Sequence, residues 1–207
     1  MTELQWKPVI YLPAQLTVSF GAEVLTAGDP APWCQRKAAE VLGPQAGRRQ
    51  VARLADSLTE HAVFFASQHV TKGAAYFYPD STRLPPRAMS EIYLVGADPD
   101  VGPMTLARAR QLTEPDERSV GETELTETEL PAGPALRVHR FRAMEPAKRR
   151  SRIGEEVDWI ICPPHSTQAV MMLTSWSEPV FSKAAISIAD EMARNFRTEP
   201  PDAAGPA

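Results

Sequence analysis

Four segments with the character of β-strands follow one another in the second half of the chain, and they constrain its fold more than any other feature. They cover residues 120–129, 135–143, 155–162 and 168–176. Connections as short as these join strands that run antiparallel. The last two segments are apolar on both faces, which is typical of strands in the middle of a sheet that is covered on both sides. The pattern predicts an antiparallel sheet at the centre of the fold.

Two further segments have the periodicity of amphipathic helices. Apolar side chains recur at steps of three and four over residues 46–69 and again over 179–196, where Ser177 is the predicted cap and Pro179 the predicted start. Each helix has one apolar stripe, so the two are suited to cover the two faces of one sheet. The expected fold class is α+β: a central antiparallel β-sheet with helices packed on both faces, an α/β/α sandwich.

The rest of the chain adds shorter elements. We expect a strand pair or a bent strand over residues 9–20, a helix over 33–42, strands over 74–78 and 91–97, and a short helix or irregular crossing over 103–113. One α+β domain of residues 1–197 is expected to contain them all. Residues 198–207 are rich in Pro, Ala, Asp and Gly and are predicted to form a disordered tail.

The formal net charge of −4 conceals a segregation of charges along the chain. Residues 114–129 hold seven acids and one base, whereas residues 137–152 hold seven bases and one acid. We expect a hairpin that places Leu130 opposite Pro134. Its charged pairs are then Glu127 with Arg137, Glu124 with Arg140, and Glu122 with Arg142. Opposed pairs stabilise a sheet by about 0.2–1 kcal/mol each, so these charges are interpreted first as determinants of register on a solvated edge, and second as a surface for a charged partner.

The expected partner of this region is another protein. The acidic total charge and the absence of aromatic residues among the basic ones argue against a nucleic-acid ligand. The predicted partner-binding residues on the hairpin and the following basic loop are Glu122, Glu124, Arg140, Arg142, Lys148, Arg149, Arg150 and Arg152. An exposed aromatic side chain near Tyr76–Tyr78 is a further candidate contact.

No motif for nucleophilic catalysis, phosphate binding or dinucleotide binding is present, and no HExxH sequence occurs. His61 and His69 are eight residues apart on a predicted helix, about 12 Å along its axis, too far to share one metal ion directly. We expect partly buried histidines with ordinary structural roles, and no cofactor or metal site.

The two cysteines are expected to be reduced and buried. Cys162 precedes His165 by three residues, but it ends an apolar strand, which does not favour a reactive thiolate. The neighbouring Glu155 and Glu156 start the same strand, and adjacent strand residues point to opposite faces. They are therefore poor candidates for a shared acid–base site.

The N-terminal sequence has neither a basic region nor an uninterrupted apolar segment of the secretory type, and no stretch approaches the roughly 18 to 20 apolar residues of a membrane helix. The expected location is the cytoplasm. Arginine is much commoner than lysine, 17 residues against 5, which is typical of a GC-rich genome such as that of an actinobacterium.

Three successive segments carry a resemblance to a known family: ELPAGPALRVHRF, EEVDWIICPP and TQAVMMLTSWSEPVFSKAAISIADEMARNFR. Over residues 118–197 the chain resembles the PsbP-like α/β/α fold of photosystem PsbP proteins, the yeast Ran-binding Mog protein, mycobacterial LpqN lipoproteins and some secretion-system chaperones. The resemblance lies in the order of scaffold motifs, none of them catalytic. It implies a binding or assembly factor.

Three functions follow from these patterns. The first is a non-enzymatic protein-interaction or assembly factor, a chaperone-like adaptor linked to a bacterial secretion system. The second is a carrier of a small molecule or lipid, with a pocket between sheet and helix lined by Met171, Met172, Trp159 or Trp176. The third, the least favoured, is an enzyme. A deep apolar pocket with converging polar groups favours a carrier or an enzyme, whereas an exposed apolar patch favours a protein partner.

Overall fold

The computed structural model describes residues 7–9, 16–68, 71–77, 88–96, 102–144, 152–164 and 166–199. The chain divides into two compact units. The N-terminal unit is Ala14–Tyr93, and the C-terminal unit combines Met1–Pro13 with Leu94–Ala207. Each unit has a buried apolar cluster of its own.

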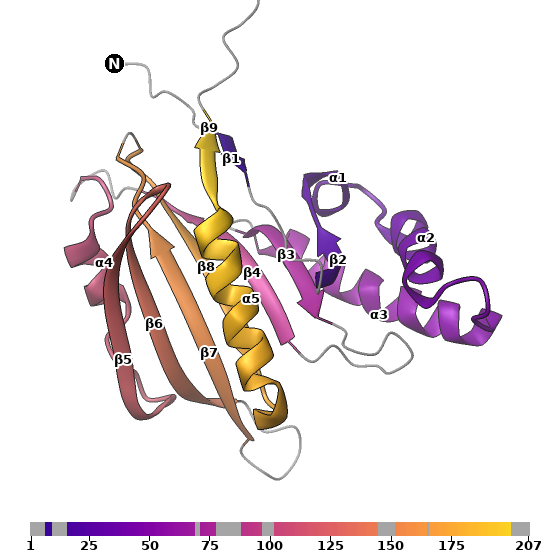
Figure 1. The fold of residues 1–207 in the computed structure, drawn as a ribbon. Helices are drawn as coiled ribbons and strands as arrows, with labels where there is room; N and C mark the ends of the chain where they lie inside the picture. The colour runs from indigo at the N-terminus through magenta and orange to yellow at the C-terminus, as the bar shows by residue number, and fades with distance from the viewer. Residues whose placement is uncertain are drawn as a thin grey trace, which may run out of the picture. The chain divides into compact units, whose positions relative to one another are not determined.

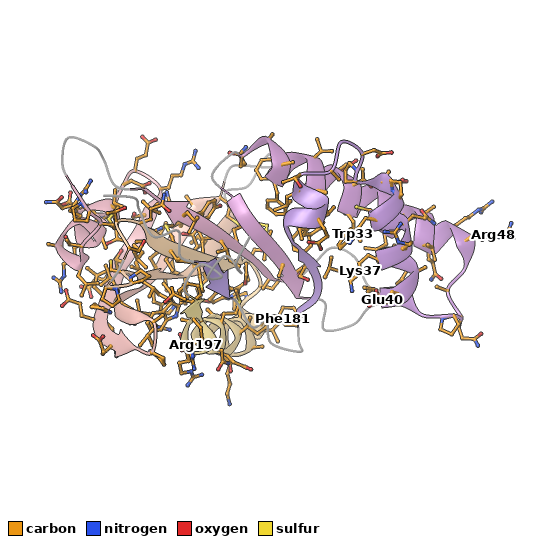
Figure 2. The ribbon with its side chains drawn as sticks, turned by 90° about the horizontal axis from the view of Figure 1, so that it is seen from above. Trp33, Lys37, Glu40, Arg48, Phe181 and Arg197 are labelled. Carbon is orange, nitrogen blue, oxygen red and sulfur yellow. The ribbon has the colours of Figure 1, made fainter. Side chains whose placement is uncertain are left out.

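Among its described residues, the N-terminal unit has three helices and three antiparallel strands. Its elements are β2 (Leu16–Phe20), α1 (Ala22–Leu25), α2 (Ala31–Leu42), α3 (Arg48–Ser67), β3 (Thr71–Phe77) and β4 (Ala88–Val95), and β3 pairs with both β2 and β4. The helices predicted over residues 33–42 and 46–69 are confirmed as α2 and α3. Trp33, Lys37 and Glu40 lie along α2 in Figure 2, and Lys37 Nζ is 2.8 Å from Glu40 Oε1.

The apolar stripe of α3 forms the core of the N-terminal unit. Leu54, Leu58 and Phe65 are fully buried. The Phe65 ring lies 5.6 Å from that of Phe20 on β2, and the Phe20 ring meets that of Tyr76 on β3 edge-on at 5.4 Å. Helix and strands are therefore joined by an aromatic cluster, and the apolar stripe seen in the sequence is the face of α3 that packs into it.

The C-terminal unit contains the predicted meander. Its elements are β1 (Lys7–Val9), α4 (Leu106–Leu112), β5 (Ser119–Leu130), β6 (Gly133–Met144), β7 (Arg152–Ile161), β8 (Ala169–Trp176), the 3₁₀ turn η1 (Pro179–Phe181), α5 (Ser182–Asn195) and β9 (Arg197–Glu199). The four long strands are antiparallel in the order β8-β7-β6-β5. In Figure 1, α5 lies along β7 and β8. Antiparallel strands with packed helices confirm the α+β class.

Helices cover both faces of these four strands. On one face, which we call the α5 face, Arg137 Nε of β6 and Trp159 Nε1 of β7 donate to the same Oδ1 atom of Asp190 on α5, at 2.9 and 3.1 Å. The alternate residues of β6 and β7 point the other way. There Leu136 and Ile160 form a buried cluster with Ala109 and other residues of and around α4. We call this side the α4 face.

The hairpin of β5 and β6 has a register different from the predicted one. Leu130 lies opposite Gly133 instead of Pro134, so Pro131 and Ala132 form a two-residue turn. Gly133 closes this turn with φ of +129°, a conformation that L side chains rarely adopt. A shift of one residue moves every side chain to the opposite face, so none of the three predicted charge pairs forms.

The residues opposite the glutamates are therefore different ones. Glu127 lies opposite Leu136, and Glu124 lies opposite His139. A further irregularity between Val120 and Glu124 removes Glu122 from the regular ladder.

Three smaller predictions also need correction. The segments of residues 9–20 that the structure describes do not pair with each other, because β1 pairs with β9 and β2 with β3. Thr198 and Glu199 belong to β9 instead of a tail, since β1 offers them a partner strand; residues 200–207 lie outside the described residues. Ser177 does not cap the last helix, which begins through η1 after Glu178.

Candidate functional site

A surface hollow of about 330 Å³ lies where the start of α5 meets the sheet. Its walls come from four strands and from the residues just before α5: Val120, Phe141, Ile153, Glu155, Trp176, Ser177 and Pro179. In Figure 1 this is the lower end of α5, where β7 begins. The walls are mostly apolar, and the hollow lies wholly within the C-terminal unit.

Strand register creates the floor of the hollow. Phe141 of β6 lies opposite Glu155 of β7, which lies opposite Trp176 of β8. Paired residues share a face of the sheet, so these three side chains form a row across the α5 face. Ile153 points to the same face because it lies two residues before Glu155.

Apolar side chains at and next to the walls of the hollow are exposed to solvent. Phe141 is 42% exposed and Ile153 is 53% exposed. Val180, next to the wall residue Pro179, is 80% exposed. We call Phe141, Ile153 and Val180 the apolar rim. Clustered apolar exposure beside a concavity is typical of surfaces that bind a partner.

The carboxylate of Glu155 joins the sheet to the start of α5. Its Oε2 accepts a hydrogen bond from Trp176 Nε1 at 2.9 Å and another from the hydroxyl of Ser182, the first residue of α5. His139 Nε2 lies 2.8 Å from Oε1. The Glu155 side chain is only 12% exposed, so these partners replace water around a nearly buried charge.

The order of these polar groups differs from that of a catalytic triad. In a triad, histidine lies between the nucleophile and the carboxylate and removes the nucleophile's proton. Here the carboxylate of Glu155 lies between Ser182 and His139, so the serine hydroxyl donates directly to the acid. The arrangement positions the indole of Trp176 and the start of α5 and leaves both carboxylate oxygens hydrogen-bonded.

The α4 face of the same strands carries a buried ion network. Arg140 Nη2 lies 2.7 Å from Asp158 Oδ2, and Arg140 Nε lies 3.2 Å from Glu156 Oε2. The side chain of Asp158 is fully buried, and its Oδ1 has no hydrogen-bond partner within the part of the chain that the structure describes. Burial raises the pKa of Asp158 from its ordinary value to about 7, although the Arg140 charge opposes that change. Asp158 is thus held inside the sheet mainly by Arg140.

Arg142 extends this network to the surface. It pairs with Asp116, in the loop before β5, and its Nη1 lies 3.9 Å from Glu156 Oε2. Arg140 and Arg142 were predicted to contact a partner protein, but their side chains are only 9% and 22% exposed and are already paired. These two residues form internal ion pairs because they lie on the same face of β6 as Leu136 and Val138, which is the α4 face.

The acidic members of the predicted site lie elsewhere. Glu122 and Glu124 are exposed on β5. The side chain of Glu124 is 74% exposed, and its Oε2 is 3.4 Å from His139 Nδ1. Glu127 lies three residues after Glu124, on the opposite face of β5, and pairs with Arg110 of α4 at 2.7 Å. The structure therefore separates the predicted acids, which face solvent, from Arg140 and Arg142, which face inward.

Most of the predicted basic loop lies outside the part of the chain that the structure describes. Lys148, Arg149 and Arg150 lie outside the described residues, and of Arg152 only the backbone is described, at the start of β7. Tyr76 is 1% exposed, so it is a core residue and offers no surface aromatic, while Tyr78 is likewise outside the described residues.

The predicted carrier pocket is present only in part. Trp176 lines the hollow, as expected for a pocket between sheet and helix. Met172 and Trp159 are buried in the core. Met171 packs with the cluster on the α4 face. Strand alternation separates Met171 from Met172, so the two cannot line one pocket.

Sequence reasoning missed Phe141, Ile153 and the role of Glu155. A signal for Phe141 existed, because it is an apolar residue between Arg140 and Arg142 in a charged strand. The prediction that Glu155 and Glu156 point to opposite faces is confirmed: Glu155 bonds to groups on the α5 face and Glu156 to Arg140 on the α4 face.

The remaining reactive side chains are in ordinary surroundings. Cys34 and Cys162 are free thiols, and burial raises the pKa of each. His61 is partly buried, and its Nδ1 lies 2.7 Å from the Ser57 carbonyl oxygen. Among the described residues, no three His, Cys, Asp or Glu side chains are grouped as metal ligands would be. No described helix combines the length and apolar character needed to cross a membrane.

Comparisons with known proteins do not assign the chain to a family. No model of a known protein family matches the chain, and a search of curated proteins gives no significant match.

Proposed function

We propose that the chain is a non-enzymatic protein-interaction module, an adaptor that binds a partner protein by taking an apolar side chain of that partner into the hollow beside α5. One observation carries the proposal: the hollow is apolar, has an exposed apolar rim, and its one carboxylate is already hydrogen-bonded within the protein. Such a site offers contact area without an unsatisfied charge that would require a polar ligand.

The dimensions of the hollow favour a single side chain, rather than a whole small molecule, as its occupant. A volume of about 330 Å³ is at the lower end of the roughly 300–1,000 Å³ range of small-molecule pockets. Those pockets bury most of their ligand, whereas this one is a surface depression. A single aromatic or branched side chain, presented by a larger partner whose surface covers the rim, fits this geometry. The carrier function is the second candidate, supported by the place of Trp176 in the wall.

The resemblance to PsbP-like proteins gives this adaptor a context. Chaperone-like binding of a component of a secretion system, in the cytoplasm of a bacterium, is the role that the resemblance implies. We include it in the proposal because an adaptor with an apolar docking site suits such a role.

Site-specific crosslinking in the native host tests the proposal. A photoreactive amino acid replaces Ile153 in the apolar rim, and a matched chain carries it at Leu112 of α4, which is exposed to a similar extent but lies outside the hollow. We expect a defined protein adduct from position 153 only. The identified partner, once purified, should bind the chain at least ten-fold more weakly after Phe141→Ser and unchanged after Leu112→Ser.

Two results would overturn the proposal. Equal adducts from both positions would show that the hollow is not selective. A bound small molecule in native mass spectrometry, lost after Phe141→Ser and without any protein adduct at position 153, would favour the carrier instead.

A further inference from the structure

The outer edge of β5 has no partner strand among the described residues. β5 is the last strand in the order β8-β7-β6-β5. From Glu124 to Leu130 it pairs residue for residue with β6, without a bulge. A regular edge of this kind presents backbone N–H and C=O groups that can pair with another extended chain.

The side chains of this edge carry negative charge only. β5 contains four glutamates and no lysine or arginine: Glu122, Glu124, Glu127 and Glu129. All four are exposed. Within the described part of the chain, Glu122 and Glu129 form no ion pair, and Glu124 meets only His139, at 3.4 Å.

The basic residues of the neighbouring strand do not neutralise this edge. Arg137 of β6 pairs with Asp190 of α5. Arg140 pairs with Asp158 and Glu156 on the α4 face. The two bases therefore satisfy buried or half-buried acids. Glu127 is paired with Arg110 of α4, so the charges that remain available to a ligand are those of Glu122, Glu124 and Glu129.

This charge decides which kind of strand the edge accepts. A second copy of the chain would place glutamates beside glutamates, and like charges on adjacent strands destabilise a sheet. Lysine or arginine side chains at those positions would instead form opposed pairs. We propose that the outer edge of β5 receives an extended basic segment of the partner protein as an added strand, and that an apolar side chain of the same segment enters the hollow. This inference rests on the proposed function, because the hollow is common to both.

Val120 connects the outer edge of β5 with the hollow beside α5. Val120 lines the hollow and belongs to β5, four residues before Glu124. That separation is about 13 Å along a strand at roughly 3.3 Å per residue. Between the two residues the ladder is irregular, and Gly121 has φ of +74°. A segment of about ten to twelve residues can therefore pair along residues 124–130 and then turn into the hollow at the bulge.

Synthetic peptides test this inference directly. The first is a fluorescein-labelled 12-residue peptide in which Lys and Thr alternate, with one Phe near an end. A second peptide replaces every Lys with Glu, and a third replaces two Thr with Pro, which has no N–H to donate. Binding to the full chain is measured by fluorescence anisotropy, and protection of the β5 amides by hydrogen exchange.

Charge-reversed chains provide the matched comparison. One combines Glu124→Lys with Glu129→Lys on β5, and the control combines Asp56→Lys with Glu60→Lys on the exposed side of α3. The Lys peptide is expected to bind at least ten-fold more weakly to the β5 variant and equally well to the control. It should also slow exchange over residues 124–130, and the Glu and Pro peptides should not bind.

Several results would overturn the inference. They are equal weakening in the α3 control, binding of the Pro peptide as tight as that of the Lys peptide, or unprotected amides in β5. If these occur while the adduct at position 153 persists, strand addition is wrong and the proposed function stands. If the β5 amides are protected but position 153 gives no adduct and Phe141→Ser has no effect, the hollow is wrong and the strand edge alone binds.

Discussion

Arg140 Nη2 lies 2.7 Å from Asp158 Oδ2, between two central strands and almost out of contact with solvent. Removing one member of a buried pair leaves the other charge uncompensated, which costs about 3–5 kcal/mol, whereas replacing both by apolar residues is often neutral. We expect Arg140→Met to lower the free energy of unfolding by that amount. The double variant Arg140→Met with Asp158→Leu should recover most of the loss in urea denaturation. Equal destabilisation by the single and double variants would show that the pair is not a coupled unit.

The raised pKa of Asp158 predicts a particular dependence of stability on pH. Because the folded-state pKa, about 7, is above the ordinary value of 3.8, the folded protein favours the protonated acid. The contribution to stability is complete below about pH 4 and is lost as pH rises towards 7, with a slope of at most about 1.4 kcal/mol per pH unit. Arg140, Glu156 and Arg142 are the charged groups that influence it.

The variant Asp158→Asn isolates this contribution. An amide does not titrate, so the difference in unfolding free energy between wild type and variant should change across pH 4–7 and be flat above pH 8. Urea midpoints at half-unit pH steps measure it, with Glu122→Gln on the exposed strand as the control. A difference that is independent of pH would contradict the assignment to Asp158.

Gly133→Ala is expected to destabilise the β5–β6 hairpin. With φ at +129°, an added Cβ would lie 2.8 Å from the Cys162 carbonyl oxygen, a backbone atom that cannot easily move. Strained backbone positions of this kind cost about 1–3 kcal/mol. Gly28→Ala is the control, because a Cβ there meets nothing within 4 Å. Thermal unfolding compares them, and an unchanged midpoint for Gly133→Ala would show that the turn tolerates a side chain.

Asp190 fastens α5 to the sheet through hydrogen bonds from Arg137 and Trp159. Asp190→Ala leaves the buried Trp159 and the half-buried Arg137 without this acceptor, which costs about 1–3 kcal/mol. The amides of α5 should then exchange faster than those of β6 and β7 in hydrogen-exchange mass spectrometry. Glu191→Ala, which changes the neighbouring acid on the same helix, should leave exchange unaltered. Uniform acceleration over the whole unit would indicate global destabilisation instead.

The sequence predicted the helices and strands better than it predicted which residues lie opposite one another in the sheet. Helix α3 and the strands β7 and β8 were visible because of the periodicity or continuity of their apolar residues. The register of the β5–β6 hairpin was not, because it depends on whether Gly133 belongs to the turn or to the strand. That one residue decided which residues of β5 lie opposite the charges of β6, whereas the burial of Arg140 follows from its acids Glu156 and Asp158 on β7.

The hollow was difficult to predict for a related reason. Phe141, Glu155 and Trp176 are far apart in the chain and meet only through the registers of two strand pairs. Trp176 was a candidate because, with Met171, Met172 and Trp159, it could line a groove, whereas Phe141 stood among arginines and was absorbed into the charge pattern. The acid Asp158 in an apolar strand was the overlooked sign that a buried cation lies nearby.

The two-residue turn also limits how this hairpin can change during evolution. Inserting or deleting one residue between Leu130 and Gly133 would exchange the two faces of β5 relative to β6. Leu125 and Glu127 would then move to the α5 face, and the ion pair between Arg110 and Glu127 would be lost. Substitutions of Pro131 and Ala132 have no such effect, since they preserve the spacing. Among proteins that share this hairpin, the length of the turn should therefore vary less than its residues.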